Sequence, residues 1–331
     1  LGDKQAYPQI ETNRWLEQDG VQIFYASPGA LNWESVLVQI RDTKPDYLYL
    51  NSMYSTCFTI YPLLMKRLGM IKGQVVLAPR GMLKSTAVQY KTGKKQLFFK
   101  LLKWLRVQKQ IIFHATDTTE ETDIRNLFGK DVTIKQITNF PPQQKALQII
   151  NKQSGAIKII FVGRVHPIKN LSFLLTCLQT ITAKVQLTIV AAIEDEAYWI
   201  KCGDIINNLT ERVTVKLQQD IPHHQIEQLI NNHHLFVLPT LGENFGHAIF
   251  EALSAGRPVL ISDQTPWRNL QEYYAGWDLS LSDEAAFVRV LQQVAAMDDE
   301  AYQQWSTGAW QYAKNFTESS DLKEKYKELF S

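Results

Sequence analysis

The sequence predicts an α/β protein with two Rossmann-like domains, and three observations carry this prediction. Short runs rich in β-branched and aromatic residues alternate with helical stretches of roughly ten to fifteen residues. The runs are apolar throughout, which is typical of parallel strands covered on both faces. A chain of 331 residues is long enough for two domains of ordinary size.

The expected strands form two groups. Those of the first half cover residues 22–26, 47–50, 74–78, 111–115 and 133–138. Those of the second half cover residues 157–163, 185–190, 213–217, 235–239 and 258–262. The opening segment LGDKQAYPQIETNRW is polar and is expected to be irregular. We interpret it as part of a chain that lacks its true beginning. After residue 282 the pattern is helical to the end.

Two prolines mark the expected domain boundary. Pro141 and Pro142 interrupt the alternation of strands and helices, as in a linker. We expect an incomplete N-terminal domain over 1–140, a linker over 141–156, a second domain over 157–300, and C-terminal helices over 301–331 that cross back to the first domain. Two such domains face a cleft, and ligands of open α/β sheets bind beyond the carboxyl ends of the strands.

Composition excludes several classes of protein. The three cysteines, an odd number, are widely separated and form neither a disulfide framework nor a metal spacing, which favours a reducing, cytoplasmic compartment. No apolar run is long enough to span a bilayer, and no signal peptide is found. Residues 1–150 hold 20 Lys and Arg against 12 Asp and Glu, a net charge of +8, while the remainder holds 15 against 21, a net of −6. The first half therefore suits an anionic partner or surface.

The first chemical motif is IIFVGRVHPIKNLSFLL, residues 159–175. An expected strand ends at Gly163, where a side chain would obstruct a ligand. Arg164 and Lys169 follow on the loop and at the start of a helix. Two cations beside a positive helix N-terminus suit a diphosphate. The alternative is a solvated loop with two surface cations.

The second motif is LPTLGENFGHAIFEALSAGRPVLIS, residues 238–262. Glu243 lies on the loop after a strand, Gly246 opens a helix, and Glu251 lies on that helix. A carboxylate accepts hydrogen bonds from sugar hydroxyls, and a second one can hold both hydroxyls of a ribose. Backbone N–H groups near Phe245 and Gly246 can face a phosphate, and Gly256 ends the helix. The alternative is that both glutamates are solvated charges at a helix start.

Together these motifs resemble the retaining glycosyltransferases of family four, which have the GT-B fold. The resemblance rests on GRVHPIKN, on GENFG with an E-x7-E spacing, and on EALSAGRPVLIS. It is strong over about residues 157–281, and weaker through APRGML (78–83) and FHATDTTEETDIR (113–125). It implies that residues 157–300 bind a nucleotide-sugar and that residues 1–140 lie on the acceptor side.

The resemblance also implies roles for individual residues. Arg164 and Lys169 match the cations that hold the donor diphosphate, and Glu243 matches the acidic position near the transferred sugar; these three are the candidate catalytic residues. Glu251 matches the ribose-binding carboxylate. The remaining candidate donor-binding residues are Gly163, Asn244, Phe245, Gly246 and His247. No Asp-x-Asp and no His/Cys cluster with ligand spacing occurs, so no cofactor and no metal are expected.

The chain departs from the family on the acceptor side. Many relatives carry a histidine after the strand equivalent to 74–78, where this chain has Arg80 and Gly81. Arg80 is a candidate for binding an acidic acceptor or leaving-group charge; a structural ion pair is the alternative. His114, at the end of the next strand, is a second acceptor-side candidate, with a core histidine as the alternative. The glycine-rich loop that relatives have after their first strand is absent, which leaves the activity of this chain in question.

Two further features carry predictions. KTGKKQLFFKLLKWLRVQKQ, residues 91–110, places seven cations among apolar positions at helical spacing. It is either an interfacial helix on anionic lipid or a crossover helix with its lysines in water. The histidine pairs at 223–224 and 233–234 flank an expected helix and are interpreted as surface or loop residues.

The function expected from the resemblance is transfer of a sugar from a nucleotide-sugar to an acceptor hydroxyl with retention of configuration. The acceptor is expected to be a glycan or a lipid-linked molecule in surface polysaccharide or glycolipid synthesis. The expected location is cytoplasmic, with residues 91–110 in peripheral contact with the inner face of the membrane, and no nucleic acid is involved. The alternatives are a non-catalytic sugar-nucleotide-binding fragment and a sugar-nucleotide epimerase of the same fold.

Overall fold

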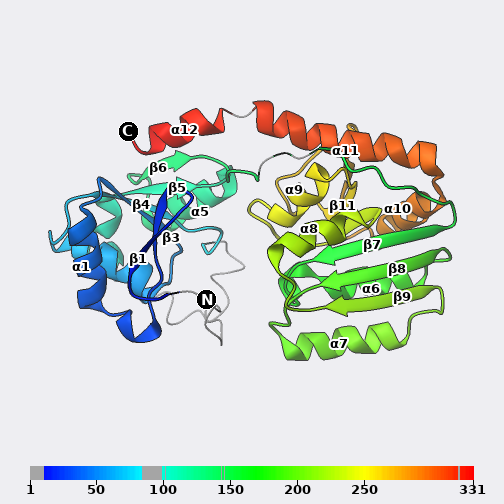
Figure 1. Cartoon of the computed structure of the whole chain (residues 1–331), viewed down its shortest axis with the longest axis horizontal. Helices are drawn as coiled ribbons and strands as arrows, with labels where there is room; N and C mark the ends of the chain where they lie inside the picture. Colours follow the sequence, from blue (N-terminus) through cyan, green and yellow to red (C-terminus); the bar gives the residue numbers. More distant parts are fainter. Residues whose placement is uncertain (1–10, 84–98, 101, 143, 145, 320) are drawn as a thin grey trace. The chain divides into compact units, whose positions relative to one another are not determined.

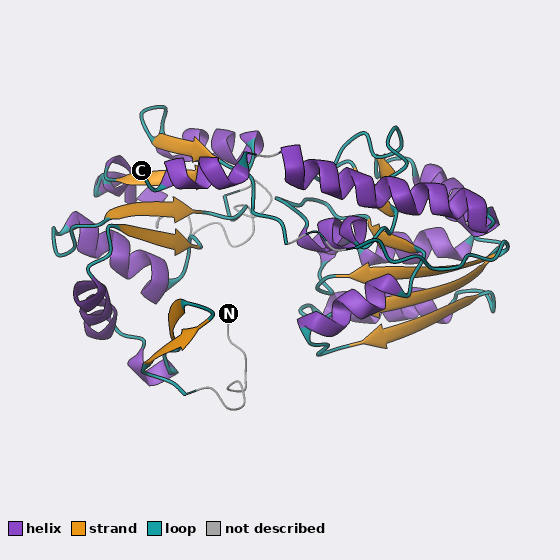
Figure 2. Ribbon diagram, turned by 45° about the horizontal axis from the view of Figure 1, so that its top comes forward, coloured by secondary structure: helices purple, strands orange, loops and turns teal. Residues whose placement is uncertain are grey.

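The computed structural model of the chain describes residues 11–83, 99–100, 102–142, 144, 146–319 and 321–331. Contacts between Cα atoms divide the chain into two units. One holds Leu1–Ile137 together with Glu328–Ser331, and the other holds Thr138–Lys327. Figures 1 and 2 show strands flanked by helices in each unit. The α/β fold with two parallel sheets, matching the GT-B type, is confirmed.

The N-terminal unit contains a parallel sheet in the order β3-β4-β5-β6. The buried apolar residues of these strands form the core of the unit. The strands are β3 (Tyr47–Asn51), β4 (Gln74–Ala78), β5 (Ile111–Ala115) and β6 (Thr133–Gln136). The helices and short turns are η1 (Pro28–Ala30), α1 (Trp33–Thr43), η2 (Thr56–Ile60), α2 (Tyr61–Arg67), η3 (Val107–Lys109) and α5 (Thr118–Phe128).

The beginning of the described chain differs from the prediction. Residues expected to be irregular form β1 (Trp15–Gln18), which pairs antiparallel with β2 (Val21–Phe24). The two turn residues, Asp19 and Gly20, both have positive φ angles, the geometry of a tight hairpin. The expected strand at 22–26 therefore belongs to a separate hairpin and not to the parallel sheet. The prediction was wrong on this point because the partner strand, β1, had been interpreted as irregular.

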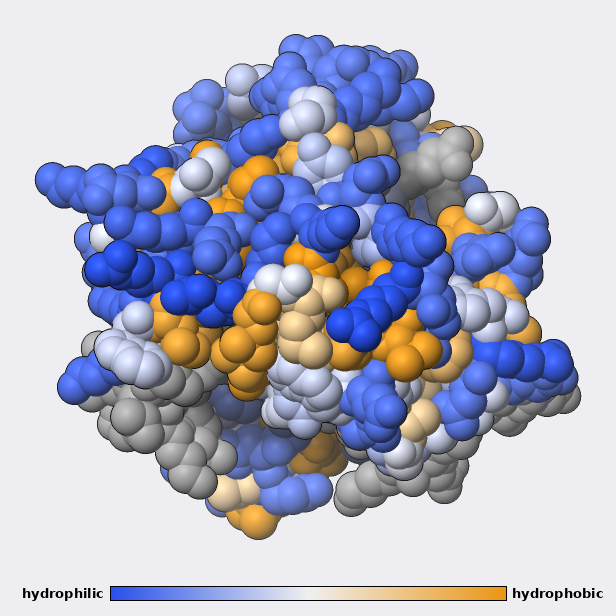
Figure 3. All heavy atoms as spheres, turned by 90° about the vertical axis from the view of Figure 1, so that its left-hand side faces the viewer, coloured by the Kyte–Doolittle hydropathy of each residue, from blue (hydrophilic) through white to orange (hydrophobic). Residues whose placement is uncertain are grey.

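The basic segment 91–110 is described only in part. Its residues 91–98 and 101 lie outside the described residues. In the described part, Phe99 and Leu102 are buried in the core of the N-terminal unit, whereas Trp104 is exposed. No described helix is both long and apolar enough to cross a membrane. Figure 3 shows one face of the molecule, on which apolar side chains lie among hydrophilic ones.

The C-terminal unit contains a parallel sheet in the order β12-β11-β10-β7-β8-β9. The strands are β7 (Ala156–Val162), β8 (Lys184–Val190), β9 (Val213–Gln218), β10 (Leu235–Leu238), β11 (Val259–Ser262) and β12 (Gly276–Leu279). The helices and the short turn are η4 (Pro167–Lys169), α6 (Leu171–Gln179), α7 (Glu196–Asn207), α8 (His223–Asn231), α9 (His247–Ser254), α10 (Glu284–Ala296), α11 (Asp299–Ser319) and α12 (Leu322–Leu329).

Each expected strand is present, with its bounds shifted by at most two residues, but β12 was not expected. Glycine and aspartate are depleted in strands, so GWDL does not read as one. Gly276 has φ +146°, and a Cβ there would meet the Val259 carbonyl oxygen at 2.1 Å. The close pairing of β12 with β11 thus depends on the missing side chain.

Helix starts follow from capping residues that are visible in the sequence. Asn32, Asp117, Asp195 and Asp283 each accept a hydrogen bond from the backbone N–H three residues later. Each side chain satisfies a donor that the first helical turn leaves unpaired. These caps set where the helices α1, α5, α7 and α10 begin.

The segment expected to be a linker, 141–156, is held by side chains of the C-terminal unit. Arg257, fully buried, donates from Nη2 to the Gln148 carbonyl. Gln303 donates to the Ile150 carbonyl at 2.8 Å. The buried Lys152 ammonium donates to the Gln153, Ala295 and Met297 carbonyls at 2.8–3.2 Å. Burial lowers the pKa of this ammonium to about 8.

The second histidine pair contradicts its sequence prediction. His233 and His234 are buried, at 7% and 8% exposure, instead of lying on the surface. His234 Nδ1 accepts from the Lys158 N–H at 3.0 Å, so its Nε2 carries the proton donated to the Asn151 carbonyl. His233 is hydrogen-bonded through Nε2 to the Thr188 hydroxyl and through Nδ1 to the Leu229 carbonyl. Each ring is thus part of the core. The side chains of the other pair, 223–224, lie outside the described residues.

The buried histidines should make stability fall at low pH. Burial lowers the pKa of His114 and His233, and lowers that of His234 to about 4. A histidine of the unfolded chain binds its proton at about pH 6.5, so below that pH the unfolded state binds more protons than the folded state. Stability should therefore be full above pH 6.5 and fall as the pH drops toward 4. His234 alone should account for about 3 kcal/mol at pH 4.

Thermal unfolding between pH 4 and 8 measures this effect. The variant His234→Gln has no ring to protonate, so its loss of melting temperature between pH 6.5 and 4 should be smaller than that of the unmodified chain. Equal losses in both proteins would contradict the assignment of His234 as a neutral core residue.

Candidate functional site

The order of the C-terminal sheet places two loops next to each other. Strands run outward from β7 in both directions, through β8 to β9 on one side and through β10 to β12 on the other. β7 and β10 are parallel neighbours, with Ile159 opposite Leu235 and Ile160 opposite Phe236. A crevice forms beyond the carboxyl ends of strands where the strand order reverses. The loops that follow β7 and β10 carry the two sequence motifs.

The first loop is compact. His166 Nδ1 accepts from the Ile168 N–H at 3.2 Å and caps the short turn η4, which Pro167 begins. Asn170 then has φ +56°, and α6 begins at Leu171. Lys169 is therefore the last residue of the short turn η4, which precedes the helix. It was expected at the start of the helix itself. The turn directs its ammonium toward the second loop.

An ion pair joins the two motifs. Lys169 donates from Nζ to Glu243 Oε1, and the two side chains are only 17% and 12% exposed. The backbones are joined as well, because the Ile168 carbonyl accepts from the Leu241 N–H at 2.7 Å and from the Thr240 hydroxyl at 3.0 Å. Two candidate residues that are far apart in the sequence thus lie in one partly buried pair.

The loop after β11 supports Glu243 from the other side. The Glu243 N–H donates to the Gln264 carbonyl at 3.0 Å, and the buried Ser262 hydroxyl donates to the Thr240 carbonyl. The position of Glu243 is therefore set by three neighbouring strand ends. Ser262 and Gln264 were not singled out in the sequence analysis, because a serine and a glutamine after a strand carry no distinctive pattern.

Arg164 pairs with a residue that the sequence analysis did not identify. Its Nη1 donates to both carboxylate oxygens of Glu194, at 2.8 and 2.6 Å. The pair is open to solvent, with 58% and 45% of the two side chains exposed. Glu194 lies in the loop after β8, the neighbour of β7. The signal that could have found it is an acidic residue just beyond a buried strand.

The ring of Phe245 belongs to an aromatic cluster in the core of the C-terminal unit. Its side chain is buried, with ring centroids 5.2 Å from Trp267, 6.0 Å from Phe250 and 6.1 Å from Phe316. The Trp267 indole N–H donates to the Phe245 carbonyl. Because the ring is part of this aromatic cluster, only the backbone of Phe245 is left to contact a ligand.

Gly246 begins the helix that carries Glu251. It has φ +77° and ψ +63° and precedes α9, as the sequence predicts. A Cβ at this position would lie 2.7 Å from Ile249 Cδ1. Glu251, partly buried, lies four residues after the exposed His247 and therefore on the same helix face. Asn244, also partly buried, lies between Glu243 and the aromatic cluster.

The acceptor-side candidates Arg80 and His114 are linked through Tyr49. Arg80 donates to Asn51 Oδ1 at 2.8 Å and to the Tyr49 hydroxyl at 2.9 Å. That hydroxyl lies 2.6 Å from His114 Nδ1, while His114 Nε2 lies 2.7 Å from the Ile137 carbonyl. A carbonyl only accepts, so Nε2 carries the proton and Nδ1 accepts from Tyr49. His114 is fully buried, and its ring contacts the same Tyr49 hydroxyl that Arg80 contacts.

Gly81 is tied to a buried carboxylate. Glu120, only 1% exposed, accepts from the Gly81 N–H with Oε1 and from the Thr116 N–H and hydroxyl, at 2.8 and 2.7 Å, with Oε2. The two weaker motifs, 78–83 and 113–125, therefore meet at one side chain. Sequence reasoning missed Glu120 because three of its neighbours are also acidic.

An apolar pocket of about 570 Å³ lies next to the Arg80 network. Tyr49 and Asn51, both bonded to Arg80, line it together with Trp15, Phe24 and Met82. This pocket belongs entirely to the N-terminal unit.

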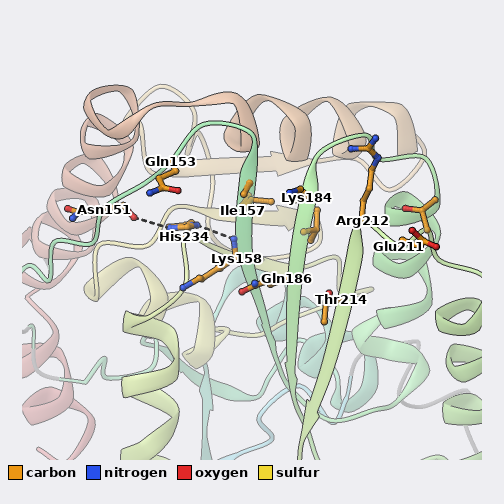
Figure 4. Close-up of a pocket in the computed structure, with 13 residues that line it drawn as sticks. Asn151, Gln153, Ile157, Lys158, Lys184, Gln186, Glu211, Arg212, Thr214 and His234 are labelled. Atoms are coloured by element: carbon orange, nitrogen blue, oxygen red, sulfur yellow. Dashed lines mark hydrogen bonds between the residues drawn. The ribbon is translucent and has the colours of Figure 1, made fainter.

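A larger pocket lies at the opposite edge of the C-terminal sheet, away from both motifs. It has a volume of about 900 Å³ and is formed where β7, β8 and β9 begin (Figure 4). Lys158, Lys184 and Arg212 line it from three adjacent strands, and Figure 4 shows His234 bonded between Asn151 and the backbone of Lys158. Because it lies at the amino ends of the strands, it is not the predicted donor edge.

Among the described residues no group of three or more His, Cys, Asp or Glu side chains is arranged to hold a metal ion. The three cysteines are free thiols, and burial raises the pKa of Cys177 to about 12 and that of Cys202 to about 11.

The C-terminal unit is similar to a known family. Residues 156–296 match the family model described as Glycosyl transferases group 1. This stretch contains both motifs and the ion pair between them. None of the curated proteins matches the sequence.

Solved structures share the fold of the whole chain. Anabaena Alr3699/HepE in complex with UDP and glucose is 15% identical, with a TM-score of 0.65 over 89% of this chain and 80% of that one. Sucrose-phosphate synthase (tll1590) from Thermosynechococcus elongatus is 16% identical, with a TM-score of 0.65 over 98% and 85%. WaaG, a glycosyltransferase involved in lipopolysaccharide biosynthesis, is 12% identical, with a TM-score of 0.60 over 89% and 93%. The resemblance drawn from the sequence is confirmed.

Two glycines of the site should respond differently to the same substitution. At Gly163 an added Cβ would contact Lys169 and Phe161 at 3.7–3.8 Å, which is ordinary packing. Gly163→Ala should therefore leave the melting temperature nearly unchanged. Gly246→Ala meets both a positive φ and the Ile249 side chain, and should cost about 1–2 kcal/mol or more.

Calorimetric or circular-dichroism melting of both variants checks this pair. A marked loss of stability in Gly163→Ala would mean that the protein itself, and not a ligand, requires glycine at the end of β7.

Proposed function

We propose that this chain, whose C-terminal unit is a glycosyltransferase group 1 domain on a GT-B fold, transfers a sugar from a nucleotide-sugar donor to an acceptor hydroxyl with retention of configuration. The observation that carries the proposal is the Lys169–Glu243 ion pair at the switch point of the C-terminal sheet, on the same loop that carries Arg164. Two cations and one carboxylate there suit a diphosphate joined to a sugar.

In this proposal the cations bind the diphosphate and stabilise its charge as the sugar leaves. The bond between the anomeric carbon and the phosphate oxygen breaks, and the acceptor oxygen forms the new bond on the same face. The proton of the acceptor hydroxyl passes to the departing phosphate, so no protein base is needed. Electrostatic stabilisation of the leaving group carries the catalysis.

Glu243 and Glu251 take separate parts of the donor in this proposal. Glu243, held by Lys169, faces the transferred sugar, and Glu251 on α9 holds the ribose. The backbone at Phe245 and Gly246 lies against the phosphate at the helix N-terminus. Gly163 leaves room for the donor, and Asn244 and His247 complete its contacts.

The acceptor side is proposed from the N-terminal unit. Arg80, beside Gly81, is a cation held by Asn51 and Tyr49, and it suits an acceptor with an anionic group. The positive charge of the first half and the basic segment 91–110 favour a lipid-linked or glycan acceptor at the inner face of a membrane. That WaaG takes part in lipopolysaccharide biosynthesis is consistent with surface polysaccharide or glycolipid synthesis.

The donor can be identified by thermal shift. UDP comes first, because the Anabaena protein was solved with UDP and glucose; GDP, ADP and the corresponding sugars follow. A ligand at one hundred times its dissociation constant adds about 2.7 kcal/mol of stability. The shift should persist in EDTA, since cations of the protein take the place of a metal. No shift with any of these ligands would contradict the proposal, and binding without transfer would favour the non-catalytic alternative.

The two cations should each contribute strongly to nucleotide affinity. Arg164→Ala and Lys169→Ala each remove charge-assisted hydrogen bonds to the diphosphate, worth roughly 1.5–3 kcal/mol, so the affinity should fall by about tenfold to a hundredfold. Titration calorimetry with the free nucleoside diphosphate measures this. Because Lys169→Ala also removes the ion-pair partner of Glu243, the double variant Lys169→Ala/Glu243→Gln is the control for indirect effects. Unchanged affinity in both single variants would exclude this phosphate site.

The two glutamates should fail in different ways. Glu251→Gln should weaken the free nucleotide and the nucleotide-sugar alike, because both contain the ribose. Glu243→Gln should leave the free nucleotide nearly unaffected and reduce turnover, because a contact to the reacting sugar strengthens in the transition state. Titrations with nucleotide and nucleotide-sugar separate these cases. The reverse pattern would exchange the two roles.

A further inference from the structure

The contact between Arg164 and Glu194 joins a guanidinium to an oxyanion, as in the binding of a phosphate by an arginine. One guanidinium nitrogen donates to both carboxylate oxygens, at 2.8 and 2.6 Å. Carboxylates and phosphates are bound by the same planar fork of arginine donors. Glu194 therefore occupies one guanidinium nitrogen, Nη1, to which a donor phosphate would also bind.

The backbone holds Glu194 at this position. Ile193 forms a parallel bridge with Val165, the residue after Arg164. The N–H groups of Glu194 and Asp195 both donate to the Val165 carbonyl, at 3.3 and 3.1 Å. Asp195 in turn caps α7 by accepting from the Tyr198 N–H at 2.9 Å. The loop that carries Glu194 is thus fastened to the loop that carries Arg164.

We infer that Glu194 is a resident anion that competes with the donor diphosphate for Arg164. This inference rests on the proposed function of the site. When the donor binds, its phosphate replaces the Glu194 carboxylate on the guanidinium. After transfer, Glu194 takes Arg164 back, which promotes release of the nucleoside diphosphate.

Because the Arg164–Glu194 pair is exposed, breaking it for this exchange costs little free energy. With 58% and 45% of the side chains exposed, the ion pair is of the kind that contributes little to stability. The Lys169–Glu243 pair at the same edge is far less exposed and is a fixed part of the site. One pair therefore holds its geometry, and the other can open for the ligand.

Removing the competitor should tighten nucleotide binding. Glu194→Gln should raise the affinity for UDP by roughly twofold to fivefold, the factor expected for losing an exposed ion pair, and should slow UDP dissociation. Glu196→Gln is the matched control, because it removes the same charge from an exposed position two residues away, in the first turn of α7. Both variants change exposed side chains and should fold.

A double variant tests the mechanism itself. In Arg164→Ala there is no guanidinium to release, so adding Glu194→Gln should produce no further gain in UDP affinity. Titration calorimetry and stopped-flow dissociation on the full chain, with GDP and ADP in parallel, measure all five proteins. Equal effects of Glu194→Gln and Glu196→Gln, or a gain that persists without Arg164, would overturn the inference.

The proposed function can fail separately. If Arg164→Ala binds every nucleotide as tightly as the unmodified chain does, Arg164 is not a phosphate ligand and the donor site itself is wrong. If Arg164→Ala weakens binding and Glu194→Gln does not strengthen it, the donor site stands and only the competition is excluded.

Discussion

The parallel pairing of β7 with β10 is the constraint on which the candidate site depends. These strands are separated in the chain by two complete strand–helix units, and their pairing reverses the strand order of the sheet. Because of it, the loop after β7 and the loop after β10 leave the sheet at adjacent points. The Lys169–Glu243 ion pair and the hydrogen bonds to the Ile168 carbonyl follow from that adjacency. A shift of either strand would separate the two motifs.

Behind this edge, an aromatic cluster anchors the turn at Gly246. Phe245, Phe250 and Trp267 pack with Phe316 of α11, so the last long helix of the unit stabilises the turn at Gly246. Within GENFG, Phe245 supplies packing, Gly246 supplies a left-handed backbone conformation, and Glu243 supplies charge. A single short motif thus combines core packing, a special backbone conformation and charge.

The N-terminal unit uses buried polar groups for a similar purpose. Arg80, Tyr49, His114 and the Ile137 carbonyl form a continuous chain of hydrogen bonds from a partly exposed cation to the core. The buried Glu120 holds the neighbouring Gly81 backbone. The Tyr49 hydroxyl and the Nε2–H of His114 each donate to an acceptor, and such pairing is what allows polar side chains to be buried. The cation is therefore held in place by the side chains of Asn51 and Tyr49.

The sequence by itself determined the fold class, the strands of both parallel sheets except β12, and the two loops that carry Arg164, Lys169 and Glu243. It could do so because apolar runs, capping residues and glycines with positive φ leave local patterns. Only the tertiary structure decided that Lys169 pairs with Glu243 and that Arg164 pairs with Glu194. It also decided that the ring of Phe245, His114 and the pair His233–His234 belong to the core. Those outcomes depend on contacts between distant segments, and no local pattern records whether a polar side chain will find a buried partner there.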